Sequence, residues 1–296
     1  MLTGSQKFGL MRGVSDSLAG RCGVAELEGL ELHELGDVYK GQLREHGIAS
    51  ILVRGFMPQL WKDLGMSPAD YHRAYLATYL ERDVRQILNV GSLRDFSRFM
   101  GAAAVRSGQL LNRSELAKEV GVPARTINQW LGVLEASNQV TLLEPWFANV
   151  GKRLVKAPKL YFNDVGLLCF LLGLTEASLP QSYLLGAIWE TFCCAELRKW
   201  IEVGSPAARL WFYRDDSREV DFVVEHAGAL TLADAKWTEH PAARDFEQMA
   251  HVASRLRGVR TPMLVLSRTS APFPVAQDRL TIGMADMRAA IPLGDA

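Results

Sequence analysis

The sequence predicts an α/β protein, because helix and strand patterns alternate through its second half. Over residues 210–237, apolar and aromatic runs are broken by His226, Ala227 and Gly228, which is typical of neighbouring antiparallel strands joined by a tight turn. An apolar helix pattern, GAIWETFCCAELRKWI, precedes these strands, and they are followed by a helix, then a strand over 261–266, and a last short strand near 279–282. Earlier, tyrosines and leucines of 68–100 recur at spacings of three and four, which predicts helices.

The composition fits a globular chain of two domains or three small ones. The chain has 296 residues, of which 48% are hydrophobic. Lys plus Arg and Asp plus Glu both number 33, so the formal net charge is +0. The average charge therefore gives no sign of a polyanionic partner, and any nucleic-acid surface must be a local patch.

The cysteines and the apolar runs favour a cytoplasmic protein without a membrane partner. Neither a CxxC pair nor a suitably spaced histidine accompanies Cys22, Cys169, Cys193 and Cys194, so we expect buried, reduced thiols rather than a zinc site or disulfides. The longest apolar run, 165–174, is about half of a membrane span. The N-terminus lacks a basic segment leading into an apolar core.

The first residues predict the end of a strand, a helix and a second strand. Apolar side chains of 6–19 have helical spacing, with Ser5 at the N-cap position and Gly20 at the C-cap position. A short strand over 22–27 follows. The chain thus opens inside a structural unit.

The segment LLNRSELAKEVGVPARTINQWLGVLEASNQVTLLEPW predicts a winged helix-turn-helix. We expect Ser114 to cap a helix over 115–120, Gly121 to make the turn, and Pro123 to lie in the first turn of a longer helix before a wing at 140–146. In such folds the second helix enters the major groove, so the candidate DNA contacts are Arg125, Thr126, Asn128 and Gln129. Alternatively, the module binds a protein.

A basic run follows this segment and suits contacts with DNA phosphates. Its members, with no acid before Asp164, are Lys152, Arg153, Lys156 and Lys159. A strand over 159–162 then leads into an apolar helix, and we interpret Asp164 as the N-cap of that helix and not as a ligand. Residues 175–182 are polar, contain a proline and are expected to form a linker.

Alternation along the later strands sorts the acids by face. Asp234 and Lys236 point the same way, whereas Ala235 points into packing. On the preceding strand we expect one face to hold Glu219, Asp221 and Val223, and the other to hold Val220, Phe222 and Val224. Two facing strands therefore bring Asp221, Asp234 and Lys236 together. The like charges of the two acids should raise one of their pKa values.

An acid followed at a distance by acid-x-Lys resembles the PD-(D/E)xK, or restriction-endonuclease-like, nuclease superfamily, whose core has the same αβββαβ order. The resemblance implies that Asp221 and Asp234 hold Mg²⁺ or Mn²⁺ and that Lys236 orients or activates the attacking water. It implies an auxiliary acid at Glu190 or Glu219. Oxygen-bound divalent ions neutralise the charge that develops in phosphodiester cleavage. Alternatively, the two aspartates are ordinary strand-end acids and Lys236 is their solvated partner.

The LTGS-helix-LAGR-strand pattern, with RGFMP at 54–58 and YLATYLERDVR at 75–85, resembles bacterial and archaeal AAA-type ATPases that carry a C-terminal domain of unknown function. The resemblance covers nearly the whole chain and implies that Ser5 is a polar sensor and that Arg21 lies near the γ-phosphate. Alternatively, Arg21 is an ordinary solvated arginine. The sequence has no GxxxxGK[ST] loop and no apolar strand ending in paired acids, so ATP would bind only if a missing N-terminal segment were restored. ATPase activity is not expected from the chain as given.

We therefore expect either a gene start assigned too late or a truncated homologue, whose open sheet edge near Leu2 and Val24 would favour self-association. The expected organisation is a remnant of the AAA core and the start of its lid at 1–60, a helical lid or connector at 61–105, a winged-helix module at 106–175 and a restriction-endonuclease-like module at 183–285. Two functions follow as hypotheses. One is a DNA-associated, metal-dependent nuclease; the other is a non-catalytic module that binds DNA or a partner protein.

Overall fold

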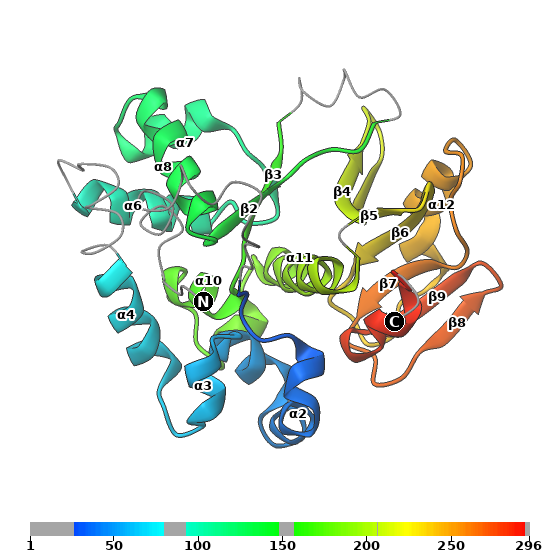
Figure 1. Ribbon diagram of the computed structural model, residues 1–296, viewed down its shortest axis with the longest axis horizontal. Helices are drawn as coiled ribbons and strands as arrows, with labels where there is room; N and C mark the ends of the chain where they lie inside the picture. Colours follow the sequence, from blue (N-terminus) through cyan, green and yellow to red (C-terminus); the bar gives the residue numbers. More distant parts are fainter. Residues whose placement is uncertain (1–26, 80–92, 148–156, 206, 294–296) are drawn as a thin grey trace, which may run out of the picture.

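The computed structural model describes residues 27–79, 93–147, 157–205 and 207–293. The expected helix over 6–19 lies outside these residues, as does nearly all of the strand expected over 22–27. The candidate residues outside them are Ser5, Arg21, Lys152, Arg153 and Lys156, together with Leu2, Cys22 and Val24. The described part is a mixed α/β structure with two β-sheets and helices packed against them (Figure 1).

Helices form the first part of the described chain. Their bounds are α2 (Leu32–Arg54), α3 (Pro58–Lys62), α4 (Pro68–Tyr79) and α6 (Leu93–Ala104). Helices α4 and α6 agree with the helical pattern predicted over 68–100, on the residues of that range that the structure describes. Their buried side chains join one large core that continues into the later helices.

A three-stranded antiparallel sheet follows, with strand order β1-β3-β2. Its strands are β1 (Gln109–Leu110), β2 (Val140–Leu143) and β3 (Lys159–Phe162), and the helices between the first two are α7 (Arg113–Val120) and α8 (Ala124–Ala136). Gly121 ends α7 in the left-handed region at φ 79°, as the turn prediction requires. The predicted cap was wrong: the side chain of Asn112, not of Ser114, accepts the first N–H groups of α7.

The prediction for Asp164 is confirmed, because its side chain accepts a hydrogen bond from the N–H of Leu167 and caps α10 (Val165–Leu171). The expected linker over 175–182 is partly helical and packs into the core. It contains a short 3-10 helix, η2 (Leu179–Gln181), and the side chain of Leu179 is fully buried.

The C-terminal part is built around a six-stranded mixed sheet of order β4-β5-β6-β7-β9-β8. Helix α11 (Leu185–Gly204) packs on one face and α12 (Glu247–Ala253) on the other (Figure 1). The strands are β4 (Arg209–Arg214), β5 (Glu219–His226), β6 (Ala229–Ala235), β7 (Met263–Ser267), β8 (Phe273–Ala276) and β9 (Arg279–Gly283). The remaining short helices are η3 (Ala243–Phe246), η4 (Met284–Asp286) and α13 (Met287–Ala290).

The first three strands pair antiparallel, whereas β6, β7 and β9 are parallel. The turn between β5 and β6 consists of Ala227 and Gly228, both at positive φ, as expected for a two-residue hairpin. The predicted strands over 261–266 and near the end of the chain correspond to β7 and β9. Strand β8, at the sheet edge, was not predicted.

A β-bulge in β5 changes the face of the sheet to which some of its side chains point, so the predicted faces of this strand were partly wrong. Trp211 pairs with Val223 and Tyr213 with Val220, so the single residue Phe212 of β4 lies opposite two residues of β5. Val223 therefore packs with Val220 in the core beside α12, instead of sharing a face with Asp221. The other two apolar residues of the strand, Phe222 and Val224, belong to the large core around α11.

The two sheets are joined by backbone hydrogen bonds. After β2 the chain runs beside β4, where the N–H of Phe212 donates to the carbonyl of Glu144 at 3.2 Å and the N–H of Trp146 donates to the carbonyl of Phe212 at 2.6 Å. This bridge fixes the three-stranded sheet against β4. Strand β3 consequently faces the start of β5 and the middle of α11.

The described cysteines Cys169, Cys193 and Cys194 are buried and free, as expected. Among the described residues, no helix combines the length and the apolar character that a membrane crossing requires.

Candidate functional site

Asp221 and Asp234 face each other at one end of the pairing between β5 and β6. The regular backbone pairing of the two strands ends at Phe222 and Ala233. Beyond this pair, the aspartate side chains accept hydrogen bonds from the backbone N–H groups. The N–H of Asp221 donates to Asp234 Oδ1 at 3.0 Å, and the N–H of Ala235 donates to Asp221 Oδ2 at 3.0 Å. The two predicted acids are thus brought together, and the backbone fixes both of them.

The side chain of Lys236 completes this group. Its Nζ lies 3.5 Å from Asp234 Oδ2 and 4.0 Å from Asp221 Oδ2. Asp234 is nearly inaccessible, with 5% of its side chain exposed, whereas 36% of the Lys236 side chain is exposed to solvent. The structure therefore brings together all three residues that the acid-x-Lys pattern singled out.

Burial and the carboxylate of Asp221 raise the pKa of Asp234 to about 7. The direction is the one predicted from the sequence, although burial is the larger cause. Burial lowers the pKa of Lys236, but the carboxylates of Asp234 and Asp221 outweigh this effect and raise it. Lys236 is therefore a cation held against two acids, one of which is hard to ionise without it.

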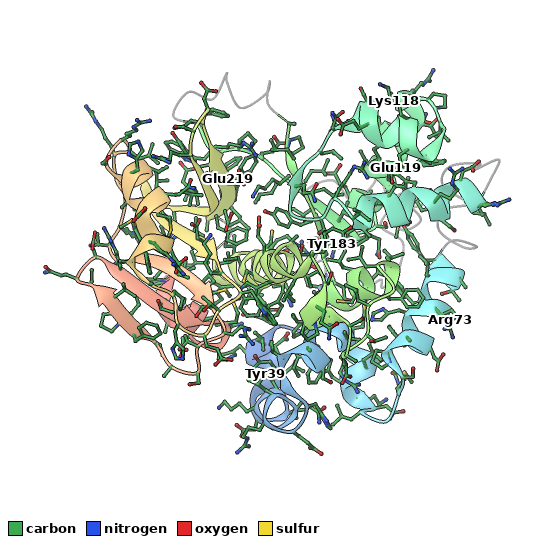
Figure 2. The ribbon with its side chains drawn as sticks, turned by 180° about the vertical axis from the view of Figure 1, so that it is seen from behind. Tyr39, Arg73, Lys118, Glu119, Tyr183 and Glu219 are labelled. Atoms are coloured by element: carbon green, nitrogen blue, oxygen red, sulfur yellow. The ribbon has the colours of Figure 1, made fainter. Side chains whose placement is uncertain are left out.

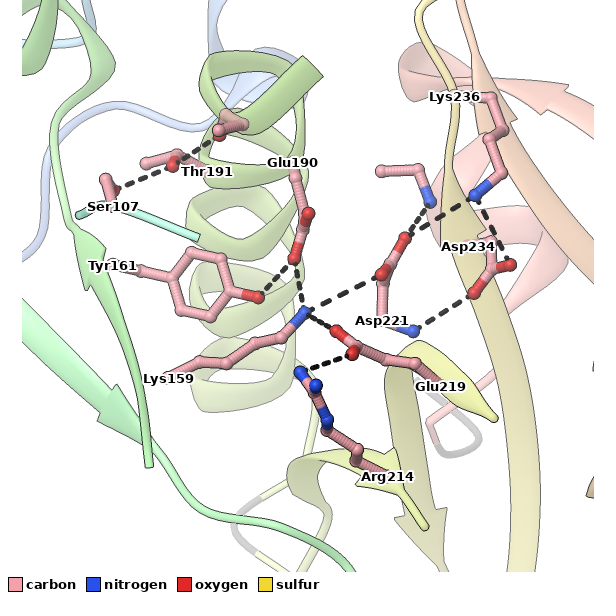
Figure 3. A network of polar contacts seen from close by, with 12 residues as sticks. Ser107, Lys159, Tyr161, Glu190, Thr191, Arg214, Glu219, Asp221, Asp234 and Lys236 are labelled. Carbon is pink, nitrogen blue, oxygen red and sulfur yellow. Dashed lines mark hydrogen bonds and ion pairs between the residues drawn. The ribbon is translucent and has the colours of Figure 1, made fainter. Parts of the chain in front are cut away.

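Glu190 and Glu219, the candidate auxiliary acids, meet at a lysine that was not predicted to belong to this site (Figure 3). Lys159 Nζ lies 2.9 Å from Glu190 Oε1, 2.5 Å from Glu219 Oε1 and 3.7 Å from Asp221 Oδ1. The second oxygen of Glu219 binds Arg214 Nη1 at 2.9 Å. Both glutamates thus belong to the same cluster as the two aspartates.

Tyr161 adds a hydroxyl to this cluster from the same strand as Lys159. Its OH donates to Glu190 Oε1 at 2.6 Å. Burial, followed by the negative charge of Asp221, raises the pKa of Glu190 to about 7, while Lys159 and Tyr161 act against that rise. In Figure 2, Glu219 lies in the six-stranded sheet, at the start of β5, whereas Lys118 and Glu119 lie on α7 across the molecule.

The placement of Lys159 corrects the prediction that it contacts DNA phosphates as part of an exposed basic run. Only 3% of its side chain is exposed, and three carboxylates surround its ammonium group. The sequence carried one signal of this position: Lys159 and Tyr161 lie two residues apart in a short apolar strand, so both point to the same side.

The donor set of the cluster fits a hard divalent cation, because all four acids supply carboxylate oxygens. Lys236 already lies within 4.0 Å of an oxygen of each aspartate, so this pair attracts positive charge. Within the described residues, however, no group of three or more His, Cys, Asp or Glu side chains adopts metal-binding geometry. Metal binding would therefore require the carboxylates to turn from their present partners.

The candidate DNA contacts lie on α8, away from this cluster. Arg125, Asn128 and Gln129 are exposed and Thr126 is half-buried, while Ile127 and Trp130 turn into the core. The helix therefore presents a polar face to solvent.

Two family models match separate parts of the chain. Residues 45–178 match a domain of unknown function, DUF8612, and residues 185–287 match another domain of unknown function, DUF4143. Neither description states an activity. Lys159 and Tyr161 lie in the first match, whereas all four acids of the cluster lie in the second.

The chain is also similar to two uncharacterized mycobacterial proteins, one of Mycobacterium bovis and one of Mycobacterium tuberculosis. Each is 31% identical over 243 residues, which cover 82% of this chain and 53% of the relative. The chain thus spans about half the length of the curated relatives it matches. No solved structure gives a significant match.

Proposed function

We propose that the C-terminal module is a metal-dependent phosphodiesterase that acts on DNA. The observation that carries the proposal is the facing pair Asp221 and Asp234, with the ammonium of Lys236 within 4.0 Å of both. Two carboxylates can hold a divalent ion that assists phosphodiester hydrolysis, and a lysine beside them adds positive charge near the phosphate. The element order α11, β4, β5, β6, α12, β7 supports the proposal, because it matches the αβββαβ order of restriction-endonuclease-like nucleases.

In this proposal, Asp221 and Asp234 would hold Mg²⁺ or Mn²⁺, and Glu190 or Glu219 would assist as a further acid. The ion would neutralise the developing charge on the phosphate and lower the pKa of the attacking water. Lys236, whose side chain is partly exposed, would orient that water and add positive charge near the phosphate. The partial burial of the cluster strengthens each of these electrostatic interactions.

We propose further that α8 contacts the DNA through Arg125, Thr126, Asn128 and Gln129. Its place after α7, between the strands of a small antiparallel sheet, supports a winged-helix arrangement. The DUF4143 match agrees with the resemblance to proteins associated with AAA-type ATPases, and we propose that the chain acts in such a context without hydrolysing ATP itself.

The proposal is tested by combining calorimetry with a plasmid-nicking assay, with EDTA or Mn²⁺ present. The parent protein should gain thermal stability from Mn²⁺ by mass action and should nick plasmid DNA. Asp221→Asn and Asp234→Asn should lose both effects. Glu239→Gln, at an exposed carboxylate outside the cluster, is the matched control and should lose neither.

A different outcome would favour the non-catalytic alternative. Each of the four acids already has a cation partner within 4.0 Å, which suits a closed structural cluster. If the parent shows neither Mn²⁺ stabilisation nor nicking, the module is a scaffold that binds DNA or a partner protein.

A further inference from the structure

A buried ammonium group lies at the centre of the acidic cluster. Lys159 Nζ contacts one oxygen each of Glu190, Glu219 and Asp221, at 2.9, 2.5 and 3.7 Å (Figure 3). Because only 3% of this side chain is exposed, solvent contributes little to the screening of these contacts. The nuclease-like arrangement of Asp221, Asp234 and Lys236 does not use this lysine.

The contacts of Lys159 require its charge. Burial alone would lower its pKa and favour the neutral amine, but the three carboxylates more than offset this and raise the pKa. The ring of Phe212, 5.6 Å from Nζ, adds a weaker contact with a cation. Lys159 therefore carries its positive charge in the folded protein, because the three carboxylates outweigh the effect of burial.

The strand that carries this cation is held rigidly outside the six-stranded sheet. Strand β3 is the central strand of its own sheet, where Lys159 pairs with Leu110 on one side and Leu143 on the other. The backbone bridge from β2 to Phe212 then fixes this sheet against β4. Tyr161, on the same side of β3, donates to the same oxygen of Glu190 as Lys159 does.

We propose that Lys159 is a positioning residue of the candidate site, a built-in cation from the preceding module that holds Glu190, Glu219 and Asp221 together. The inference deepens the proposed function, since it concerns the same acids. Without Lys159 the three carboxylates would repel one another, and no ammonium group would orient Oδ1 of Asp221. The site is then composite, and the six-stranded module is incomplete without β3.

The first test measures thermal unfolding of the full chain in EDTA for Lys159→Met, Glu190→Gln and the double variant. Lys159→Met should lower the Tm by about 5 °C or more, because three partly buried carboxylates lose the cation that they share. The double variant should melt at a higher temperature than Lys159→Met, because removal of one negative charge relieves the repulsion. Lys118→Met, at an exposed lysine on α7, is the control and should leave the Tm within about 1 °C of the parent value.

The second test adds Mn²⁺ to the parent and to Lys159→Met. The rise in Tm should be larger in Lys159→Met, since a divalent ion can replace the missing cation, and Lys159→Arg should return the rise to that of the parent. Substitution of a lysine that served only for packing would change neither the response to Mn²⁺ nor the effect of Glu190→Gln. This readout therefore separates a positioning role from a structural one.

Two results would overturn the inference: a double variant that melts no higher than Lys159→Met in EDTA, or a Mn²⁺-induced rise in Tm that is present and equal in parent and Lys159→Met. If Lys159→Met does not fold, the folding of the double variant tests the inference. A double variant that folds supports the charge role of Lys159, and one that does not fold refutes it. A lack of any Mn²⁺ response in both proteins counts against the nuclease proposal alone. The EDTA comparison needs no metal and still decides the role of Lys159.

Discussion

Asp234 accepts a hydrogen bond at 3.0 Å from the backbone N–H of Asp221, the residue that faces it across β5 and β6. Asp221 accepts in turn from the N–H of Ala235, also at 3.0 Å. The two carboxylates thus satisfy N–H groups beyond the last regular pair of the strands. Backbone hydrogen bonding, and not only packing, fixes the distance between the two acids.

The first prediction concerns the metal-free stability of Asp234 variants. Asp234→Asn should leave the free energy of unfolding unchanged or raise it by about 1 kcal/mol, because an amide oxygen can accept the same bond without a buried charge. Asp234→Ala should lower it by about 1–3 kcal/mol, because the N–H of Asp221 loses its acceptor. Chemical denaturation in EDTA measures both, with the exposed Asp278→Asn as control. Equal losses in the two variants would contradict this account.

The second prediction separates the role of Lys236 from that of the aspartates. Lys236→Ala should keep the Mn²⁺-induced rise in Tm, because both carboxylates remain, while plasmid nicking falls by about 10²–10⁴-fold. Lys236→Arg should retain part of the nicking, since it keeps the positive charge. Lys40→Ala on the exposed surface of α2 serves as control. Loss of the Mn²⁺ response in Lys236→Ala would mean that the lysine supports the fold of the site instead.

The third prediction addresses DNA binding by α8. Arg125→Glu should weaken binding of duplex DNA and reduce the slope of log K against log salt by about one, because the variant can no longer neutralise one DNA phosphate. The control is Arg73→Glu on α4, an arginine that is also exposed (Figure 2). Fluorescence anisotropy over a salt series gives the slopes. Identical slopes in parent and Arg125→Glu, or no binding by the parent at any salt, would assign α8 to protein interaction.

The fourth prediction distinguishes two neighbouring residues at the start of α7. Asn112 Oδ1 accepts from the N–H groups of Ser114 and Glu115, both at 3.2 Å. Asn112→Ala should therefore cost about 1 kcal/mol of unfolding free energy, whereas Ser114→Ala should change it by less than about 0.5 kcal/mol. Thermal denaturation of the two variants decides between them. If Ser114→Ala instead cost more unfolding free energy than Asn112→Ala, Ser114 would be the cap of α7, as the sequence suggested.

Local patterns in the sequence were sufficient for much of the C-terminal fold. Alternating apolar residues and a glycine turn predict β5 and β6, because a two-residue turn needs the positive φ that Ala227 and Gly228 adopt. The same alternation places Asp234 and Lys236 on one side. Asp164 was also predictable, since a cap acts on N–H groups only three residues away.

The missed features depend on contacts between distant segments or on single-residue irregularities. Lys159 reaches acids that follow it by 31 to 62 residues, and no local pattern pairs them. The bulge opposite Phe212 adds one residue to β5 and leaves the apolar pattern looking regular. Helix α2 was not predicted, and its glycines Gly36 and Gly47 adopt positive φ inside it.

The last prediction concerns His72, whose imidazole is fully buried between α2 and α10. Its Nε2 lies 3.4 Å from the carbonyl of Arg54, its ring packs beside Phe170, and its Nδ1 has no hydrogen-bond partner. Burial lowers the pKa of His72, and the nearby Asp164 carboxylate only partly opposes this. The imidazole is therefore neutral in the folded protein at neutral pH.

A lowered pKa in the folded state means that the unfolded chain binds the proton more tightly. The contribution of His72 to stability is thus present above about pH 6.5, the unfolded value, and is lost as the pH falls through the folded pKa. The free energy of unfolding of the parent should decrease over this window by up to about 1.4 kcal/mol per pH unit for this one proton. His72→Phe should remove that part of the slope, because phenylalanine fits the same aromatic surroundings and does not titrate, whereas the exposed control His240→Asn should keep it. Urea denaturation between pH 5 and pH 7 measures the slopes, and equal slopes in the parent and His72→Phe would show that another group binds the proton.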